Sequence, residues 1–198
     1  TVLAQMAAEV LGINYEDVSV VSADTSATPQ APITAGSTVT FSTGTAVVDA
    51  AAQVRDQLMA LASIGLEAPI LDLECAAGVV FVRDDPQRGM PLAEVAGRME
   101  ADQIEASVTV NPGSADYIVN SFGAHFAEVG VDLDTGQIRV LRYVAAQDSG
   151  RIINPRTALN QVEGAISQML GFALWEELVT DRPTGVTLNA SYLEHKST

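Results

Sequence analysis

Apolar residues near the start of the chain recur at the three- and four-residue spacing of an amphipathic helix. Gly12, a residue type that commonly ends helices, follows the run. A short apolar stretch with valines at positions 18, 20 and 21 comes next. The pattern predicts a helix, a turn and a short strand within the first 21 residues. The helical positions are Val2, Leu3, Met6, Ala7, Val10 and Leu11.

Residues 23–45 change character and predict a loop rich in small hydroxyl side chains. Turn-forming residues fill 23–29, and glycine, serine and threonine crowd 34–45 before an apolar helical pattern over about 45–63. Backbone N–H groups, short hydroxyls and a helix dipole together suit a phosphate or another anion. The segment has neither the Gly-Lys-Ser/Thr of a Walker loop nor Gly-x-Gly-x-x-Gly. A plain loop with helix-capping threonines has the same composition, so both interpretations stay open.

The middle of the chain, about 64–120, alternates short strands with turns. Its pattern predicts strands at Ile70–Leu73, Val79–Val82 and Ile104–Val110. Between them it predicts a loop at Asp84–Gly89, a short helix at Pro91–Met99 and a turn at Asn111–Ser114.

The last third predicts a hairpin followed by a long helix. Strands at Phe122–Val131 and Gln137–Val144 flank a glycine-containing turn. Asn154-Pro155 pairs a good N-cap with the residue favoured at the first helical position, which predicts a helix to about Leu178. A turn at Asp181–Gly185 and a strand at Leu188–Leu193 complete the pattern.

Strands and helices mix without a regular βαβ rhythm, so the predicted fold class is α+β. Three parts of one larger domain are expected: a cofactor-loop part at 1–63, intervening strands with a short helix at 64–120, and a hairpin with a long helix at 121–198.

Composition narrows the function classes. The 198 residues carry a net charge of -15, which argues against nucleic acid and anionic membrane surfaces and is typical of a soluble protein. Cys75 is the one cysteine, so neither an internal disulfide nor a cysteine-held iron–sulfur cluster is available, and a small buried apolar role is expected. Neither a membrane-length apolar stretch nor a signal-peptide pattern is visible. A helical pattern that opens at Thr1 is typical of a trimmed or processed chain.

Several polar residues are candidates for chemistry. The segment Gln147–Pro155 closes a strand and opens a helix, where Asp148 would orient a neighbour and Arg151 would hold an anion; turn formation and capping explain the same residues. Gln161 and Gln168 share a helix face. His125 is interpreted as a satisfied structural histidine, and Trp175 with the nearby Phe172 and Leu174 as core. Zinc-ligand spacing and a serine nucleophile elbow are absent from the sequence.

Three segments in order resemble the molybdopterin-binding subunit of the xanthine dehydrogenase/aldehyde oxidase family. They are TVLAQMAAEVLGINYEDVSVV with SADTSATPQAPITAGSTVTFSTGTAVVDAA, then SFGAHFAEVGVDLDTGQIRVLRYVAAQDSGRIINP, then NQVEGAISQMLGFALWEELV with LNASYLEHK. The resemblance runs from Thr1 to Lys196 and looks closest to bacterial aldehyde oxidoreductases. It implies part of the two-domain molybdopterin-binding region of a molybdenum hydroxylase.

The resemblance implies a molybdenum–molybdopterin cofactor, also known in a cytosine dinucleotide form, whose metal takes its sulfur from the pterin. No metal-ligating residue of this chain is therefore expected. The residues that match the cofactor-binding positions are Thr34, Ala35, Gly36, Ser37, Thr38 and Gln168. Asp148, Gly150 and Asn154-Pro155 match a mainly structural motif. Met169 departs from the glycine that usually follows this glutamine, which would reshape the approach to the cofactor.

The family's catalytic glutamate, in Gly-x-Gly-Glu, and its Gly-Gln-Gly segment match nothing between Thr1 and Thr198, so the chain alone is expected to be inactive. The implied whole enzyme oxidises an aldehyde or hydroxylates an N-heterocycle with water as oxygen donor. Its partners would be the rest of the molybdenum subunit and iron–sulfur and FAD domains or subunits, in the cytoplasm or alternatively the periplasm. A non-catalytic scaffold subunit and an unrelated anion-binding domain are the alternatives.

Overall fold

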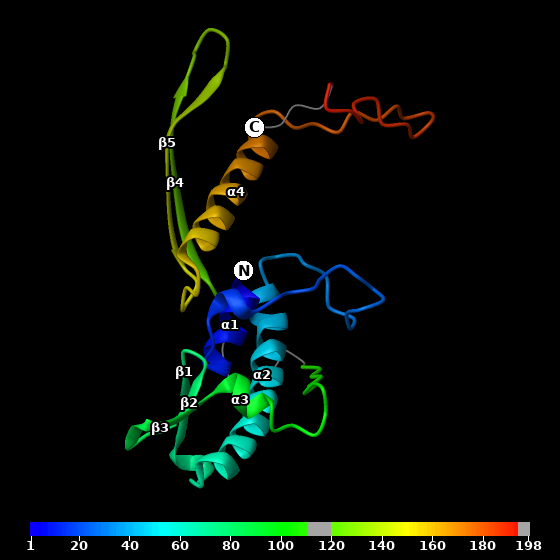
Figure 1. The fold of residues 1–198 in the computed structure, drawn as a ribbon. Coiled ribbons are helices and arrows are strands. Elements are labelled where there is room, and N and C mark those ends of the chain that lie inside the picture. Colours follow the sequence, from blue (N-terminus) through cyan, green and yellow to red (C-terminus); the bar gives the residue numbers. More distant parts are fainter. Residues whose placement is uncertain (111–119, 194–198) are drawn as a thin grey trace. The chain divides into compact units, whose positions relative to one another are not determined.

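The computed structural model describes residues 1–110 and 120–193, which form helices and short antiparallel strands (Figure 1). The α+β class is confirmed. The chain divides into two compact units, Thr1–Asp116 and Tyr117–Thr198, and each is described below by itself. The turn expected at Asn111–Ser114 lies outside the described residues.

Two helices pack against each other in the first unit. Helix α1 spans Val2–Leu11, as predicted, and ends at Gly12 with a left-handed backbone. Helix α2 spans Val39–Leu66 and so begins before residue 45, where the sequence pattern placed it. Hydroxyl groups permit the longer helix because they bond within it: Ser42 Oγ donates to the Thr38 carbonyl at 3.0 Å.

A three-stranded antiparallel sheet follows α2, in the order β1-β2-β3. Strand β2, Val79–Val82, is confirmed, but two neighbouring expectations were wrong. Ile70–Asp72 is a 3-10 turn that leads into β1, Leu73–Ala76, because the register pairs β1 with β2 only from Leu73 onward. The segment expected as a loop is β3, Asp85–Pro91.

Strand β3 forms because glycine lets it approach β2 closely. Gly89 pairs with Phe81, and an added Cβ there would lie 3.2 Å from the Phe81 Cβ. A polar, glycine-containing sequence lacks the alternating pattern of a half-buried strand, which is why the sequence indicated a loop. This strand brings Met90 opposite Val80, in the core.

The core of this unit lies between the C-terminal half of α2, the sheet and α3, Leu92–Ala96, which is shorter than the predicted helix at Pro91–Met99. Arg88 supports the end of α2 by donating to the carbonyls of Leu66 and Glu67. The buried apolar residues of the core are Leu58, Met59, Ala62, Leu66, Ala68, Leu73, Val80, Met90 and Val95.

Two predicted strands of the first unit are not strands. Residues 18–21 and 104–110 have no pairing partner in residues 1–110 or 120–193. The segment at 18–21 follows a 3-10 turn at Tyr15–Asp17 and is extended at Val18, but Val21 is 64% exposed. An apolar pattern predicts strand geometry, whereas a strand also needs a neighbour for its backbone hydrogen bonds.

The second unit contains the predicted hairpin. Strand β4 spans Phe122–Val131 as expected, and β5, Ile138–Asp148, extends beyond Val144. Asp132 closes the turn because its carboxylate accepts hydrogen bonds from the Asp134 and Thr135 N–H groups at 3.0 and 2.9 Å. Gly136 follows with a φ of 71°, which favours glycine.

Helix α4, Pro155–Leu174, begins where predicted because the Asn154 side chain accepts a hydrogen bond from Thr157 N–H at 3.1 Å. It ends at Leu174 rather than near Leu178. The expectation that Phe172 and Trp175 are core residues was wrong: they are 62% and 50% exposed, because α4 buries a single residue, Gly171.

The remaining tail follows its turn prediction only. Asp181 accepts hydrogen bonds from Thr184, as expected for the turn at Asp181–Gly185. Leu188–Leu193 is not a strand; a single bridge joins Thr180 to Thr187 instead. The Asn189 side chain links this tail to the segment that follows α4, since it accepts from Val179 N–H at 3.0 Å and donates to the Glu177 carbonyl.

Candidate cofactor site

The hydroxyl-rich loop Thr34–Thr38 forms a tight, exposed turn directly before α2 (Figure 1). Gly36 and Ser37 have consecutive left-handed backbones, with φ of 60° and 57°. The turn is closed by Thr38, whose hydroxyl donates to the Ala35 carbonyl at 3.0 Å. Turn backbones can present N–H groups to an anion, but in this turn the Thr38 N–H donates to the Ala35 carbonyl at 3.4 Å and the Ala35 N–H donates to the Ile33 carbonyl at 3.1 Å.

The first turn of α2 supplies further backbone N–H donors next to the Thr34–Thr38 turn. Thr38 precedes the helix but makes no side-chain hydrogen bond to its first turn, because the hydroxyl is engaged with Ala35 instead. The first turn carries no acidic residue. The positive end of the helix dipole therefore meets no carboxylate of its own first turn, an arrangement that fits a phosphate group.

A neighbouring turn in the same loop, around Asp24, is closed by hydrogen bonds among its own residues. The Asp24 carboxylate accepts hydrogen bonds from the Ser26 hydroxyl at 2.6 Å and the Ser26 N–H at 2.9 Å. These bonds, the side-chain bond first, hold the pKa of Asp24 below its ordinary value. The carboxylate is thus committed to shaping the loop.

Gln168, the other residue that matches a cofactor-binding position, belongs to the second unit. It lies on the exposed surface of α4, and within the described residues its amide has no hydrogen-bond partner. Met169 beside it is 60% exposed. Gln161, seven residues earlier on the same helix, already has an interaction. An exposed amide next to apolar surface offers both a donor and an acceptor to a ligand.

The segment before α4 follows its structural interpretation. Asp148 accepts a hydrogen bond from Gly150 N–H at 3.1 Å, Gly150 has a φ of 71°, and Asn154 caps the helix. Arg151 is exposed and makes no ion pair within residues 1–110 and 120–193.

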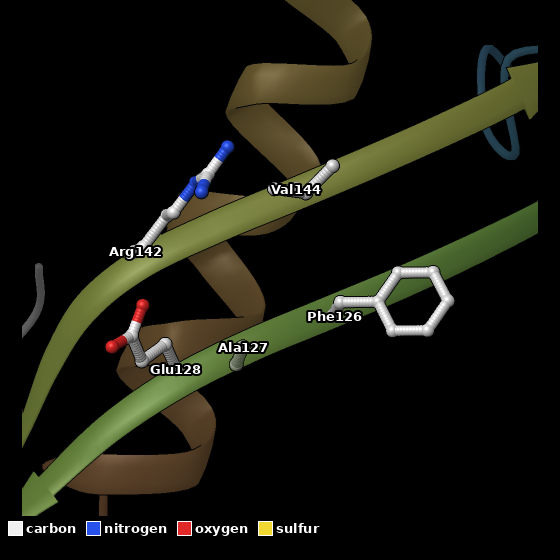
Figure 2. A pocket seen from close by; sticks show the side chains of 5 residues that line it. All are labelled: Phe126, Ala127, Glu128, Arg142 and Val144. Atoms are coloured by element: carbon white, nitrogen blue, oxygen red, sulfur yellow. The ribbon is translucent and has the colours of Figure 1, made fainter.

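A shallow hollow of about 350 Å³ lies on the hairpin, and none of the residues predicted to bind cofactor lines it (Figure 2). Phe126, Ala127 and Glu128 of β4 and Arg142 and Val144 of β5 line it. Two strands supply one wall, so the hollow is open surface. The sequence-based prediction, not this hollow, locates the candidate site.

The exposure of two single residues, Cys75 and His125, differs from what the sequence predicted. The Cys75 thiol, expected to be buried, is half-buried beside Gly12, and desolvation raises its pKa. His125 is hydrogen-bonded through both ring nitrogens, as a satisfied structural histidine should be, yet it is exposed. Sequence reasoning missed its partner Tyr143; the available signal was the hairpin register, which places 125, 143 and 147 on one face.

Within the described ranges, no three His, Cys, Asp or Glu side chains lie close enough together to hold a metal ion. In the same ranges, no helix has both the length and the apolar character needed to span a membrane.

Comparison with known proteins identifies the family. Residues 1–197 match the model of the molybdopterin cofactor-binding domain. The molybdenum-binding subunit of an aldehyde oxidoreductase from Escherichia coli O157:H7 is 35% identical over 96% of this chain and 25% of the relative. Subunit gamma of the 6-hydroxypseudooxynicotine dehydrogenase complex from Paenarthrobacter nicotinovorans is 33% identical over 98% of this chain and 25% of the relative.

A solved structure agrees with this. Quinoline 2-oxidoreductase from Pseudomonas putida 86 matches all of this chain and 26% of its own, with a TM-score of 0.87 and 31% identity. The chain spans about a quarter of the length of the curated relatives it matches. Both the sequence and the fold therefore show that this chain belongs to the molybdopterin cofactor-binding domain family.

Proposed function

We propose that this chain contributes part of the cofactor site of a molybdenum hydroxylase, which oxidises an aldehyde or hydroxylates an N-heterocycle with water as oxygen donor. The observation that carries the proposal is the left-handed pair Gly36–Ser37 leading into the uncapped first turn of α2. That geometry suits a phosphate, and the family is one that binds a phosphorylated pterin.

In this proposal the cofactor's phosphate binds at the turn Thr34–Thr38, to N–H groups of the first turn of α2 and to hydroxyls, with the Thr38 hydroxyl exchanging the Ala35 carbonyl for the phosphate. The residues of the turn are Thr34, Ala35, Gly36, Ser37 and Thr38, and a cytosine dinucleotide form would add a second phosphate for such donors. Gln168 presents its amide to the polar edge of the cofactor. The bound molybdenum supplies Lewis-acid and redox chemistry, while this chain's residues bind and orient the group.

Further parts of the enzyme would supply the substrate pocket and the iron–sulfur and FAD centres, on the rest of the molybdenum subunit or on partner subunits. The exposed apolar surface of the second unit supports such partners: Phe126 is 67% exposed on the hairpin, and Phe172 is 62% exposed on α4. Surfaces of this kind mark protein contacts. We place the assembly in the cytoplasm, with the periplasm as the alternative.

The test is the molybdenum and pterin content of the native complex, measured by metal mass spectrometry and by fluorescence of the oxidised pterin. About one of each per copy of this chain is expected. Their absence from an intact complex would favour a non-catalytic scaffold subunit.

A matched pair of variants tests the turn itself. Asp and Asn are both good N-caps, so Thr38→Asp and Thr38→Asn should both preserve α2. Only the carboxylate repels a phosphate, and like charges brought together cost several kcal/mol. We expect Thr38→Asp to retain about tenfold less pterin than Thr38→Asn. Equal pterin content in the two variants would show that the phosphate binds elsewhere.

A further inference from the structure

Three side chains form a continuous hydrogen-bonded row along one face of the β4–β5 hairpin. The antiparallel register pairs Gly123 with Gln147, His125 with Ala145, and Ala127 with Tyr143. Alternation along each strand places all six on the same face. His125 Nδ1 lies 3.1 Å from the Tyr143 hydroxyl, and His125 Nε2 lies 2.7 Å from Gln147 Nε2.

The small residues opposite these side chains make room for the row. An added Cβ at Gly123 would lie 2.8 Å from Gln147 Oε1 and 2.9 Å from its Nε2, so the amide lies over a strand position without a side chain. The Tyr143 ring meets the imidazole edge to face, with centroids 5.8 Å apart at 66°. The imidazole is thus held between two partners.

Donor and acceptor rules fix the protons in this arrangement. An amide nitrogen only donates, so Gln147 Nε2 must donate to a lone pair on His125 Nε2. The proton of the neutral ring then lies on Nδ1 and is donated to the Tyr143 hydroxyl oxygen. A protonated ring has N–H on both nitrogens, and its Nε2–H would face the donor of Gln147.

We infer that this row is a proton-operated amide switch: protonation of His125 makes Gln147 turn its amide over. The rotated amide presents Oε1 to the ring and exposes Nε2, so the group offered to solvent changes from an acceptor to a donor. Gln147 directly precedes the Asp148–Gly150 turn that leads to α4. A polar ligand or protein segment that contacts Gln147 would therefore meet an acceptor when His125 is neutral and a donor when His125 is protonated.

No charged residue of strands β4 and β5 shares the face of the hairpin on which His125 lies. On its own face the titratable neighbour is Tyr143. The charged strand residues Glu128 and Arg142 occupy the alternate positions, on the face shown in Figure 2, and Asp148 also alternates to that face. Arg156 and Glu163 are the charged residues of α4, and within the described residues neither forms an ion pair with His125. Histidine is the side chain that ordinarily changes charge between pH 5 and 8.

Nuclear magnetic resonance of the full chain, labelled with ¹⁵N at histidine and glutamine, tests the switch. The chain has two histidines, so the spectrum is simple. At high pH the Nδ1–H tautomer of His125 should exceed Nε2–H by about tenfold, as one hydrogen bond allows. On acidification the Gln147 amide signals should shift with the same midpoint as the ring, while those of Gln137, at the other end of the hairpin, stay still.

Two variants sharpen the test. Gln147→Glu replaces the amide with an acceptor, so the midpoint of His125 should rise by about one pH unit. Tyr143→Phe removes the acceptor for Nδ1–H, so the tautomer excess should fall, while the hydrogen bond from Gln147 keeps Nδ1–H the major form. An Nε2–H tautomer at high pH, or Gln147 signals that do not follow the ring, would overturn the inference; both readouts come from the unsubstituted chain and do not depend on the variants folding.

Discussion

Replacing Gly12 by alanine should destabilise the first unit far more than the same change at Gly78, a glycine of the same unit with open space around it. Gly12 ends α1 with φ 69° and ψ 32°. An added Cβ would lie 2.3 Å from the Cys75 carbonyl oxygen and 2.7 Å from its carbon. These are backbone atoms of β1, so no side-chain rotation relieves the clash.

The magnitude follows from two terms. The left-handed backbone costs an alanine about 1–2 kcal/mol. Forcing a methyl group into packed surroundings costs about 1–3 kcal/mol. The neighbours cannot move apart freely, because Gly78 N–H donates to the Gly12 carbonyl at 2.8 Å and Cys75 pairs with Val80. The sum, about 2–5 kcal/mol, is a large part of the stability of a typical domain.

Gly78→Ala is the matched control. Gly78 has a φ of 75° in the same unit, but nothing lies within 4 Å of its added Cβ, so only the backbone term applies. Urea unfolding followed by far-ultraviolet circular dichroism measures both variants. Gly12→Ala should lose about 1–3 kcal/mol more than Gly78→Ala. Equal losses would refute the role assigned to the contact with Cys75.

Three other outcomes are expected. Arg88→Met should lower the free energy of unfolding by about 1–3 kcal/mol, since it leaves the Leu66 and Glu67 carbonyls at the end of α2 without their donor. The control is Arg83→Met, which breaks an exposed ion pair with Glu74 and should cost at most about 1 kcal/mol in the same urea titration. Asn154→Ala should cost about 1 kcal/mol of α4 stability and Asn154→Asp should restore it, measured by circular dichroism, and a loss that Asp does not restore would contradict the capping role. Hydrogen bonds from Thr135, first through its N–H, and from Asp134 lower the pKa of Asp132. The hairpin turn is therefore stabilised above the ordinary carboxyl pKa and loses this contribution as pH falls through the lowered value. The protection factor of the Thr135 amide, its exchange rate relative to the intrinsic rate at each pH, should fall there, and Asp132→Asn should remove that pH dependence.

The elements that the sequence predicted correctly have local causes. Helix α1 ends at a glycine, α4 begins at an Asn-Pro pair, and the β4–β5 turn is closed by an aspartate three residues before its N–H partner. Each signal involves residues within one turn of one another. The order of the motifs indicated the family, whereas phosphate binding at Thr34–Thr38 stays a prediction.

The predictions that were wrong depended on contacts between distant residues. Residues 18–21 have the apolar character of a strand but no neighbour to pair with in the described part of the chain, whereas Asp85–Pro91 lacks that character and pairs with β2. Trp175 and Phe172 follow a core-like pattern on a helix that packs few of its residues.

The sequence by itself determined the helices that carry caps, the hairpin and the family, because helical periodicity, capping and turn chemistry act over a few residues. Only the tertiary structure decided that Gly12 must lack a side chain, because the Cys75 backbone lies against it, and that Gly89 lets β3 pair closely with β2. It also decided that Tyr143, His125 and Gln147 form one hydrogen-bonded row. These features depend on strand register and on the approach of separate segments, and both are set by the packing of the folded chain.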